Sequence, residues 1–398
     1  MLKLLRGAEL YAPERQGIRD VLVAGESVVW VGECEAPLPT GVEVEVVDLG
    51  GLRVVPGFID AHVHTTGGGG EAGYASRVPP VPVERFTTGG VTTVVGVLGT
   101  DDIVRHPGEL LAHTRALVER GIDAYCHAGG YHVPPVTLTG SIRSDLVHID
   151  RMIGVGEIAI SDHRSSQPTL DELLRIASDA HVAGLMTGKA GIVHLHVGDG
   201  ARGLDLIRRA LESTELPARV FNPTHVNRRK ALFDEAVEIL DRGVSIDITA
   251  FPVGPEEDAW SAEDAIERVL EQRGNLSGVT VTSDGGGCLP TFDQLGRVDS
   301  MEIGAPGALA LTLRALTRRG HSLEAVLPAF TSEPATLLRL ADKGRLGPGS
   351  AADLVVLDDE SRVRDVLVRG RWHVRDGRPR IVEPLSWNTD STNGTDRE

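Results

Sequence analysis

The 398-residue chain is predicted to be an α/β protein, a (β/α)8 TIM barrel with a small β-sandwich-like domain formed by both chain ends. In the middle of the chain, short apolar runs alternate with longer amphipathic stretches, which is typical of βαβ units and a parallel sheet. Both ends instead show strand-and-turn patterns. A TIM barrel takes about 250 residues, so the chain is long enough for a barrel and a second domain.

Eight apolar runs of the middle region are the predicted barrel strands. In chain order they are VVPGFID, VTTVVGVL, IDAYCHAG, EIAISD, GIVHLHV, VFNPTHV, VSIDITAF and VTVTSD. Amphipathic segments such as ELLAHTRALVERG and LDLIRRALES separate them and are predicted to be helices. Eight runs fit a closed barrel better than an open sheet.

The two ends are predicted to build the small domain together. Short β-type runs broken by Gly and Pro occur near the start (DVLVAGESVVWVG, VEVEVVDL) and near the end (AADLVVLD, VRDVLVRG, RWHVRDG). We therefore expect residues 1–52 plus 349–384 to form the β domain and 53–348 the barrel. The last stretch, 385–398, is polar and is predicted to be a disordered tail.

Composition narrows the class of protein. Hydrophobic residues make up 41% and charged residues 24%, as in soluble globular proteins. The formal net charge is 40 − 57 = −17, which argues against nucleic acid or an anionic membrane as a partner. The sequence shows neither a signal-peptide pattern nor an apolar run of about 20 residues. Three scattered cysteines suit a reducing compartment. We expect a cytoplasmic enzyme.

Polar residues that can bind metal recur where the apolar runs end. In order they are His62 and His64, Tyr131, Glu157, Asp162 to Arg164, His196, His225 with Arg228, and Asp284. In a TIM barrel the carboxyl ends of the strands meet at one mouth. His62 and His64 have period-two spacing, so both imidazoles face the same side of a strand and can bind one zinc ion. A lone buried histidine is more often a core residue, but residues of this kind at six strand ends favour a metal centre.

The other strand-end residues suggest roles in catalysis and substrate binding. Asp284 can bind metal and carry a proton to a leaving group, although Asp before Gly is also a common turn. Arg164 and Arg228 are natural partners for substrate carboxylates, although lone arginines are often solvated. Glu71 ends the run Gly67–Gly70 next to the first histidine pair and could meet a substrate ammonium. The alternative is a flexible loop.

Several longer motifs resemble the isoaspartyl dipeptidases (β-aspartyl peptidases) of the amidohydrolase superfamily. The matching segments, in order, are PGFIDAHVH, GGGGEAG, RHP, GGYHVP, AISDHRS, PTHVNR, IDIT and SDG. PGFIDAHVH marks only the superfamily, whereas GGGGEAG, SDHRS and PTHVNR are much more specific. The matches extend over most of the chain.

The resemblance implies a role for each matching residue. His62, His64 and Asp284 would bind the more buried zinc, and His196 and His225 the second, giving two Zn²⁺ per subunit. The implied substrate contacts and catalytic groups are Glu71 on the α-ammonium, Arg164 and Arg228 on the carboxylates, Thr100 as a nearby hydrogen-bonding group, Tyr131 on the scissile carbonyl, and Asp284 as proton carrier. Family members typically form homo-oligomers.

Two positions depart from the family. The metals are usually bridged by a lysine carboxylated on its side-chain nitrogen, and Glu157 stands there instead. A glutamate presents the same two-oxygen anion but is three atoms shorter, so either the strand must sit closer or the metals must shift. Gly156, just before it, could give the backbone freedom. Lys189 is expected in a turn and not in the site. Cys288 replaces a serine near the substrate carboxylate and is a weaker hydrogen-bond donor.

The predicted function is hydrolysis of β-aspartyl dipeptides by a hydroxide activated by two zinc ions, with Glu157 as the bridge. One alternative is an amidohydrolase that acts on another acidic N-acyl or cyclic amide. Arg164, Arg228 and Glu71 together favour a zwitterionic substrate with more than one carboxylate. A more distant alternative is a non-catalytic scaffold that has lost its metal. The four histidines and Asp284 argue against the scaffold.

Overall fold

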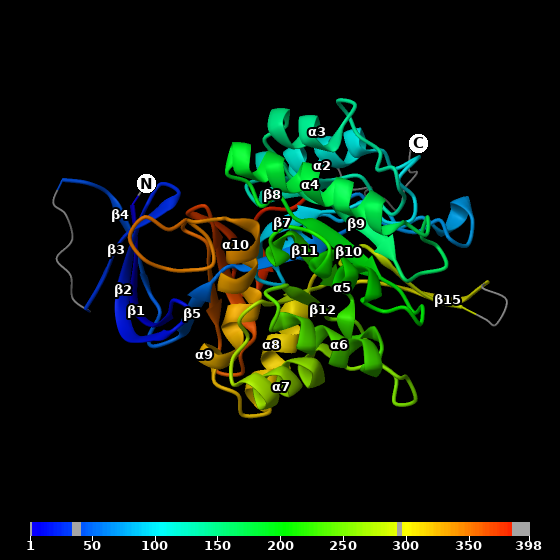
Figure 1. The fold of residues 1–398 in the computed structure, drawn as a ribbon. Helices are drawn as coiled ribbons and strands as arrows, with labels where there is room; N and C mark the ends of the chain where they lie inside the picture. The colour runs from blue at the N-terminus through cyan, green and yellow to red at the C-terminus, as the bar shows by residue number, and fades with distance from the viewer. Residues whose placement is uncertain (1, 34–40, 293–296, 384–398) are drawn as a thin grey trace, which may run out of the picture.

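The computed structural model describes residues 2–33, 41–292 and 297–383. Figure 1 shows a central barrel surrounded by helices, a sheet on one side, and a β-hairpin that projects on the opposite side. This arrangement confirms the predicted fold class. In the part of the chain that is described, no helix combines the length and the apolar character needed to span a membrane.

Eight parallel strands make the barrel. They are β6 (Phe58–Val63), β7 (Val91–Gly96), β8 (Asp123–Ala128), β9 (Met152–Ile160), β10 (Val193–Val197), β11 (Phe221–Thr224), β12 (Ile246–Thr249) and β13 (Val279–Thr282). Strands β6 to β11 form one sheet in chain order, and β12 pairs with β13. A parallel bridge between Val63 and Gly285 joins the first strand to the segment after the last one. The Thr224 hydroxyl donates to the Asp247 carboxylate across β11 and β12 at 2.7 Å.

Helices cover the outside of the barrel. They are α1 (Val83–Thr87), α2 (Pro107–Glu119), α3 (Ile142–His148), α4 (Leu170–Thr187), α5 (Asp205–Glu212), α6 (Lys230–Leu240), α7 (Ala262–Arg273), α8 (Ala308–Arg318), α9 (Leu323–Val326) and α10 (Ser332–Leu338). The 3-10 helices are η1 (Tyr74–Ser76), η2 (Ala218–Val220), η3 (Val226–Arg228) and η4 (Leu327–Phe330). The bounds of helix α4 follow from its capping residues. A capping box of Thr169 and Glu172 begins the helix, and Gly188 in the left-handed conformation ends it.

Both chain ends build the second sheet. Its strands are β1 (Leu2–Tyr11), β2 (Arg15–Ala24), β3 (Ser27–Gly32), β4 (Val44–Asp48), β5 (Arg53–Pro56), β16 (Leu354–Leu357), β17 (Val363–Val368), β18 (Arg371–Arg375) and β19 (Arg378–Pro379). Strand β5 pairs with β1 and, antiparallel, with β16, so the two ends meet in one nine-stranded sheet. The sheet has its own apolar core, which includes Leu5, Val21 and Leu354. The predicted tail 385–398 lies outside the described residues.

The projecting hairpin consists of β14 (Cys288–Phe292) and β15 (Val298–Ile303). The hairpin was not predicted from the sequence, because its strands lack the apolar runs that mark the barrel strands. It follows the last barrel strand directly and brings Cys288 to the mouth of the barrel.

The inside of the barrel is polar. Apolar residues of β6 such as Ile59 and Ala61 pack in an apolar core cluster. The residues that alternate with the apolar ones are buried and polar in several strands. They include Asp60, His62, His194, His196, Asn222, Thr224, Asp247, Thr249, Thr280 and Thr282. Period-two alternation therefore separates an outer apolar face from an inner polar one.

Candidate active site

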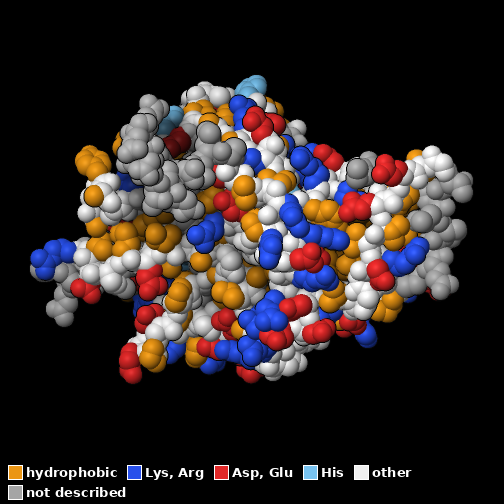
Figure 2. Space-filling view, turned by 180° about the vertical axis from the view of Figure 1, so that it is seen from behind, with side chains coloured by type: hydrophobic (Ala, Val, Ile, Leu, Met, Phe, Trp, Pro, Cys, Tyr) orange, Lys and Arg blue, Asp and Glu red, His pale blue; other side chains and the backbone are white. Residues whose placement is uncertain are grey.

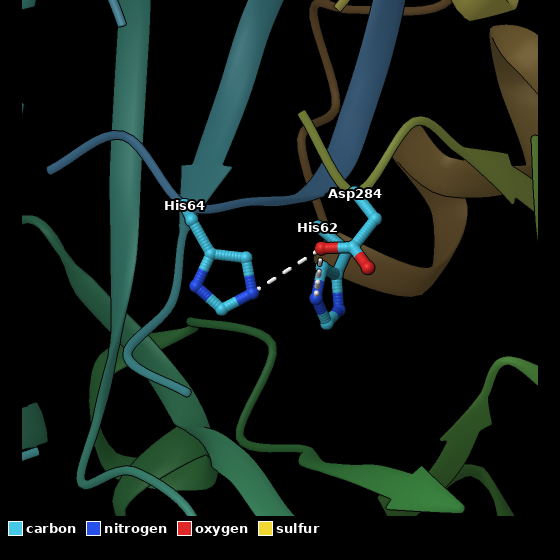
Figure 3. A group of neighbouring side chains, drawn as sticks. All are labelled: His62, His64 and Asp284. Atoms are coloured by element: carbon cyan, nitrogen blue, oxygen red, sulfur yellow. Dashed lines mark ion pairs between the residues drawn. The ribbon is translucent and has the colours of Figure 1, made fainter. Parts of the chain in front are cut away.

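His62 and His64 lie at the carboxyl end of β6 and point to the same side. Figure 3 shows both rings directed toward the carboxylate of Asp284, which follows β13. The Nε2 atoms of His62 and His64 lie 3.5 and 3.2 Å from Asp284 Oδ1. The backbone N–H of His64 donates to the Gly285 carbonyl at 2.9 Å, which fixes the two segments against each other.

Glu157 lies at the centre of the four predicted histidine ligands. Its Oε1 is 3.3 Å from His64 Nε2. Its Oε2 is 3.6 Å from His62 Nε2, 3.3 Å from His196 Nδ1 and 3.5 Å from His225 Nε2. The Glu157 carboxylate thus lies among all four imidazoles, with Oε2 close to three of them and Oε1 close to the fourth.

A local irregularity in β9 brings this short side chain into the centre. The β9–β10 register slips between Val193 and Leu195, so that two residues of β9, Gly156 and Glu157, lie opposite the single residue His194 of β10. Gly156 has a φ of 151°, and a Cβ there would lie 2.7 Å from the His194 carbonyl oxygen. Only glycine fits this position, so the backbone freedom anticipated for Gly156 is present.

The donor atoms fit a divalent metal centre. His62 Nε2, Glu157 Oε2 and Asp284 Oδ1 are buried and have no hydrogen-bond partner among the described residues. Ligand atoms about 2.1 Å from a tetrahedral zinc ion lie about 3.4 Å from one another. The observed separations of 3.2–3.6 Å match this value. Two three-residue groups have ligand atoms within 4.8 Å of one another: His62, His64 and Asp284, and His62, Glu157 and His225.

His225 and His196 are held differently. His225 Nδ1 lies 2.8 Å from the Thr249 hydroxyl, which leaves Nε2 for the centre. His196 is outside both three-residue groups. Its Nδ1 faces Glu157, while its Nε2 lies 2.9 Å from Asp162 Oδ2. Asp162 can therefore fix the orientation of this ring, as carboxylates do beside metal-binding histidines.

Burial and opposite charges set the protonation states of the cluster. Burial alone would raise the pKa of Glu157 and of Asp284, but the surrounding histidines outweigh it and lower both. Burial alone would lower the pKa of His64, but Asp284 and Glu157 raise it to about 10. Burial lowers the pKa of His225 to about 3. The two carboxylates are ionised at neutral pH and suit a cation between them.

A cavity opens directly above the cluster. Eleven of the twelve predicted site residues line it, and the twelfth, His62, is fully buried beneath it. The eleven are His64, Glu71, Thr100, Tyr131, Glu157, Arg164, His196, His225, Arg228, Asp284 and Cys288. Residues from most of the barrel strands and their loops thus converge on one mouth.

The acidic and basic groups of the cavity are already organised. Thr100 Oγ1 donates to Glu71 Oε1 at 3.0 Å, while Glu71 Oε2 is buried and has no hydrogen-bond partner within residues 2–33, 41–292 and 297–383. Arg164 Nε and Nη2 donate to both oxygens of Asp162 at 3.1 and 2.8 Å. Arg228 Nη1 donates to the Val197 carbonyl at 3.0 Å. Glu71 therefore has one oxygen to offer, and Arg164 is aligned by Asp162.

Tyr131 is placed as a hydrogen-bond donor. Its hydroxyl lies 2.8 Å from His196 Nδ1, and the Arg164 guanidinium lies 5.6 Å from the centre of its ring. Burial, together with the Glu157 charge, raises its pKa well above the usual value. The phenol therefore keeps its proton at neutral pH.

The glycine run is packed against neighbouring segments and is not a loose loop. A Cβ on Gly69, whose φ is 90°, would lie 2.4 Å from the Ser76 carbonyl oxygen and 2.8 Å from Cys288 Sγ. Burial, with Glu71 and Asp284, raises the pKa of Cys288 to about 12, so it is a neutral thiol.

Sequence reasoning missed several residues of the site. Arg105 and Asp101 line the cavity, and Arg105 is buried, with its Nη2 on the Val78 carbonyl at 2.5 Å. The RHP motif contains Arg105, but the motif alone gave no reason for its position. Asn227 fixes the loop that carries Arg228: its amide donates to the carbonyls of Thr249 and Trp260.

Lys189 lies away from the centre. Its Nζ donates to the carbonyls of Leu146 and Ile149, at 2.5 and 2.6 Å. It follows Gly188, which ends α4, in the turn expected from the sequence.

The barrel, its mouth and the set of metal-competent residues define the class of protein. The chain belongs to the amidohydrolase family, whose model matches residues 53–373. It is an enzyme fold in which polar strand-end residues meet at the barrel mouth.

Within this family the chain is similar to β-aspartyl dipeptidases. It is 41% identical to the β-aspartyl dipeptidase of Fervidobacterium islandicum AW-1 solved in complex with β-Asp-Leu, with a TM-score of 0.91 over 97% of this chain and 99% of that one. A second structure of that enzyme is 40% identical, with a TM-score of 0.88 over 97% and 100% of the two chains. The resemblance predicted from the motifs is confirmed.

More distant relatives have other activities. The imidazolonepropionase of Streptomyces griseus is 22% identical over 86% of each chain. The structure of N-isopropylammelide isopropylaminohydrolase from Burkholderia multivorans shares the fold, with a TM-score of 0.63 and 15% identity over 95% and 100% of the two chains.

Proposed function

We propose that the protein is a zinc-dependent β-aspartyl dipeptidase in which Glu157 bridges two metal ions. The observation that carries the proposal is the position of the Glu157 carboxylate, within 3.3–3.6 Å of four imidazoles below a cavity lined by Glu71, Arg164 and Arg228. The similarity to a β-aspartyl dipeptidase solved with β-Asp-Leu supports the choice of substrate.

The charges of the cavity suit a β-aspartyl dipeptide. The free Oε2 of Glu71 would accept the α-ammonium of the substrate. Arg164 and Arg228 would bind its carboxylates, since guanidinium groups pair with them through two parallel hydrogen bonds. An α-linked dipeptide carries the same charges, but its peptide carbonyl stands elsewhere relative to the ammonium. The geometry of the clamp therefore selects the β-linkage.

The side chains would act on the peptide bond in turn. Tyr131 donates a hydrogen bond to the scissile carbonyl oxygen and stabilises the negative charge that develops there. Asp284 accepts a proton from the attacking water and delivers it to the departing amine, which leaves as the free amino acid. When bound, two zinc ions would lower the pKa of the water and polarise the carbonyl. His62, His64, Asp284, His196, His225 and Glu157 are the residues that would hold them.

The proposal includes the compartment and the oligomeric state of the protein. Cys126 and Cys288 are free thiols, which suits a cytoplasmic enzyme. Acidic and basic side chains are interspersed on the face shown in Figure 2. We propose a homo-oligomer because the resembling family typically forms one.

The test is the release of aspartate from β-Asp-Leu by protein of known zinc content, with α-Asp-Leu as the control. We expect hydrolysis of the β-linked peptide alone. Zinc-loaded protein that leaves β-Asp-Leu intact would contradict the dipeptidase and favour another acidic amide. Protein that binds no metal would favour the non-catalytic scaffold.

A further inference from the structure

A chain of buried hydrogen bonds runs from the backbone below the metal centre up to His62. His62 Nδ1 lies 2.7 Å from His194 Nε2. His194 Nδ1 lies 2.6 Å from Asn222 Oδ1, and Asn222 Nδ2 donates to the Ser245 carbonyl at 3.0 Å. The three side chains are 0–1% exposed. No water is needed to complete the chain.

The donor and the acceptor of each hydrogen bond in this chain can be assigned by starting from the Ser245 carbonyl. The Ser245 carbonyl can only accept, so the amide nitrogen of Asn222 must face it and Oδ1 must face His194. Because Oδ1 can only accept, His194 carries its proton on Nδ1. In a neutral ring, Nε2 is then the acceptor, and His62 must donate to it from Nδ1.

This assignment determines which nitrogen of His62 is available to a metal ion. A neutral His62 that donates from Nδ1 keeps its lone pair on Nε2, the atom that faces Asp284 and Glu157 at 3.5 and 3.6 Å. We propose that His194 and Asn222 are positioning residues that fix the tautomer and the ring orientation of His62 for metal binding. This inference rests on the proposed function, because it assumes that a metal binds there.

The sequence contains a signal for His194 that the sequence analysis did not use. His194 and His196 on β10 have the same period-two spacing as His62 on β6 and His64 just after it. His196 faces the cavity, and His194 lies one layer deeper, behind His62.

A matched control lies in the same layer. His127 is also fully buried, with its ring centre 5.5 Å from that of His194. Neither of its ring nitrogens has a hydrogen-bond partner among the described residues. Replacing His127 removes a buried imidazole but leaves the hydrogen bonds from Ser245 to His62 intact.

The experiment measures the zinc dissociation constant by chelator competition, together with the free energy of unfolding of the metal-free protein. His194→Leu removes the acceptor for His62 and is expected to weaken zinc binding about 10- to 100-fold, the usual cost of losing such a partner. His194→Gln can place its Oε1 where Nε2 lies and is expected to restore most of the affinity. His127→Leu should leave the zinc affinity unchanged, whatever it does to stability.

Asn222→Leu provides a second variant if His194→Leu does not fold. It breaks the chain one step further from His62 and should weaken zinc binding, though less than His194→Leu. ¹⁵N NMR of the histidine rings in the zinc-loaded protein should show His194 protonated on Nδ1. Protonation on Nε2 would overturn the inference.

Two further outcomes separate the hypotheses. If the wild-type protein binds zinc and His194→Leu binds it equally well, the positioning role alone is overturned. The same holds if His127→Leu weakens zinc binding as much as His194→Leu does. Wild-type protein that binds no zinc would overturn the proposed function as well.

Discussion

Two buried charged clusters lie near opposite ends of the barrel strands, and they differ in how their charges are satisfied. Near the amino end of β8, Lys343 Nζ donates to Asp123 and to Asp353, the latter at 2.5 Å. At the carboxyl ends, Glu157 and Asp284 face four imidazoles, and each has a carboxylate oxygen without a hydrogen-bond partner in the part of the chain that is described. The first cluster is complete in itself, and the second has carboxylate and imidazole atoms arranged so that they can hold a cation.

The comparison shows that burial of charge alone does not mark a functional site. Lys343 is 6% exposed and Glu157 is 1% exposed, so burial does not distinguish them. The two clusters differ instead in the unpartnered carboxylate oxygens of Glu157 and Asp284, because a buried group without a partner costs free energy that a ligand can recover. Disrupting the mouth cluster should therefore abolish activity, and disrupting the lysine cluster should lower stability.

The largest effect is expected from Asp284→Asn. The amide cannot carry the proton and is a poor metal ligand, so kcat for β-Asp-Leu should fall about 10⁴-fold. Steady-state kinetics at measured zinc content would show this. An activity within tenfold of wild type would mean that another group carries the proton.

Lys343→Met tests the other cluster. It leaves Asp123 and Asp353 buried without their cation, which should lower the free energy of unfolding by about 3–5 kcal/mol. Urea unfolding measures the loss, and kcat of the folded fraction should not change. If the variant kept its stability and lost activity, the division between the two clusters would be wrong.

Arg228→Met should have a smaller effect, confined to substrate binding. Loss of one charged partner for a substrate carboxylate should cost about 2 kcal/mol, or about 30-fold in kcat/KM. Zinc content should stay at the wild-type value. Zinc lost together with kcat/KM would place Arg228 in the metal centre instead.

Cys288→Ser should have the smallest effect. The neutral thiol is a weaker donor than a hydroxyl, so serine should lower KM two- to threefold, about 0.5 kcal/mol. A rise in KM for β-Asp-Leu would show that the thiol contributes by packing against the Gly69 loop.

Where one rule sufficed, the sequence identified residues that the structure brings together. Period-two spacing and strand-end position found His62, His64 and Asp284, because barrel topology brings strand ends together whatever their separation in the chain. It did not find Asp162 as a partner of His196, or His194 behind His62. Those roles depend on side-chain distances between neighbouring strands, which no spacing within one segment reveals.

The fold was predicted in the same way. Apolar periodicity gave the barrel strands and the contribution of both chain ends to one sheet. The β14–β15 hairpin was missed because it is held by cross-strand pairing, such as that of Cys288 with Ile303, and not by an apolar pattern. The irregularity at Gly156 was anticipated only as backbone freedom, since a register slip depends on the neighbouring strand.

The central claim is that Glu157 bridges two metal ions without carbon dioxide. The most direct test measures zinc per chain and turnover of β-Asp-Leu in protein prepared and assayed without bicarbonate, and then with bicarbonate added. We expect two zinc ions per chain and the same turnover in both conditions. A rise in activity with bicarbonate, or a single zinc ion in fully active protein, would contradict the claim.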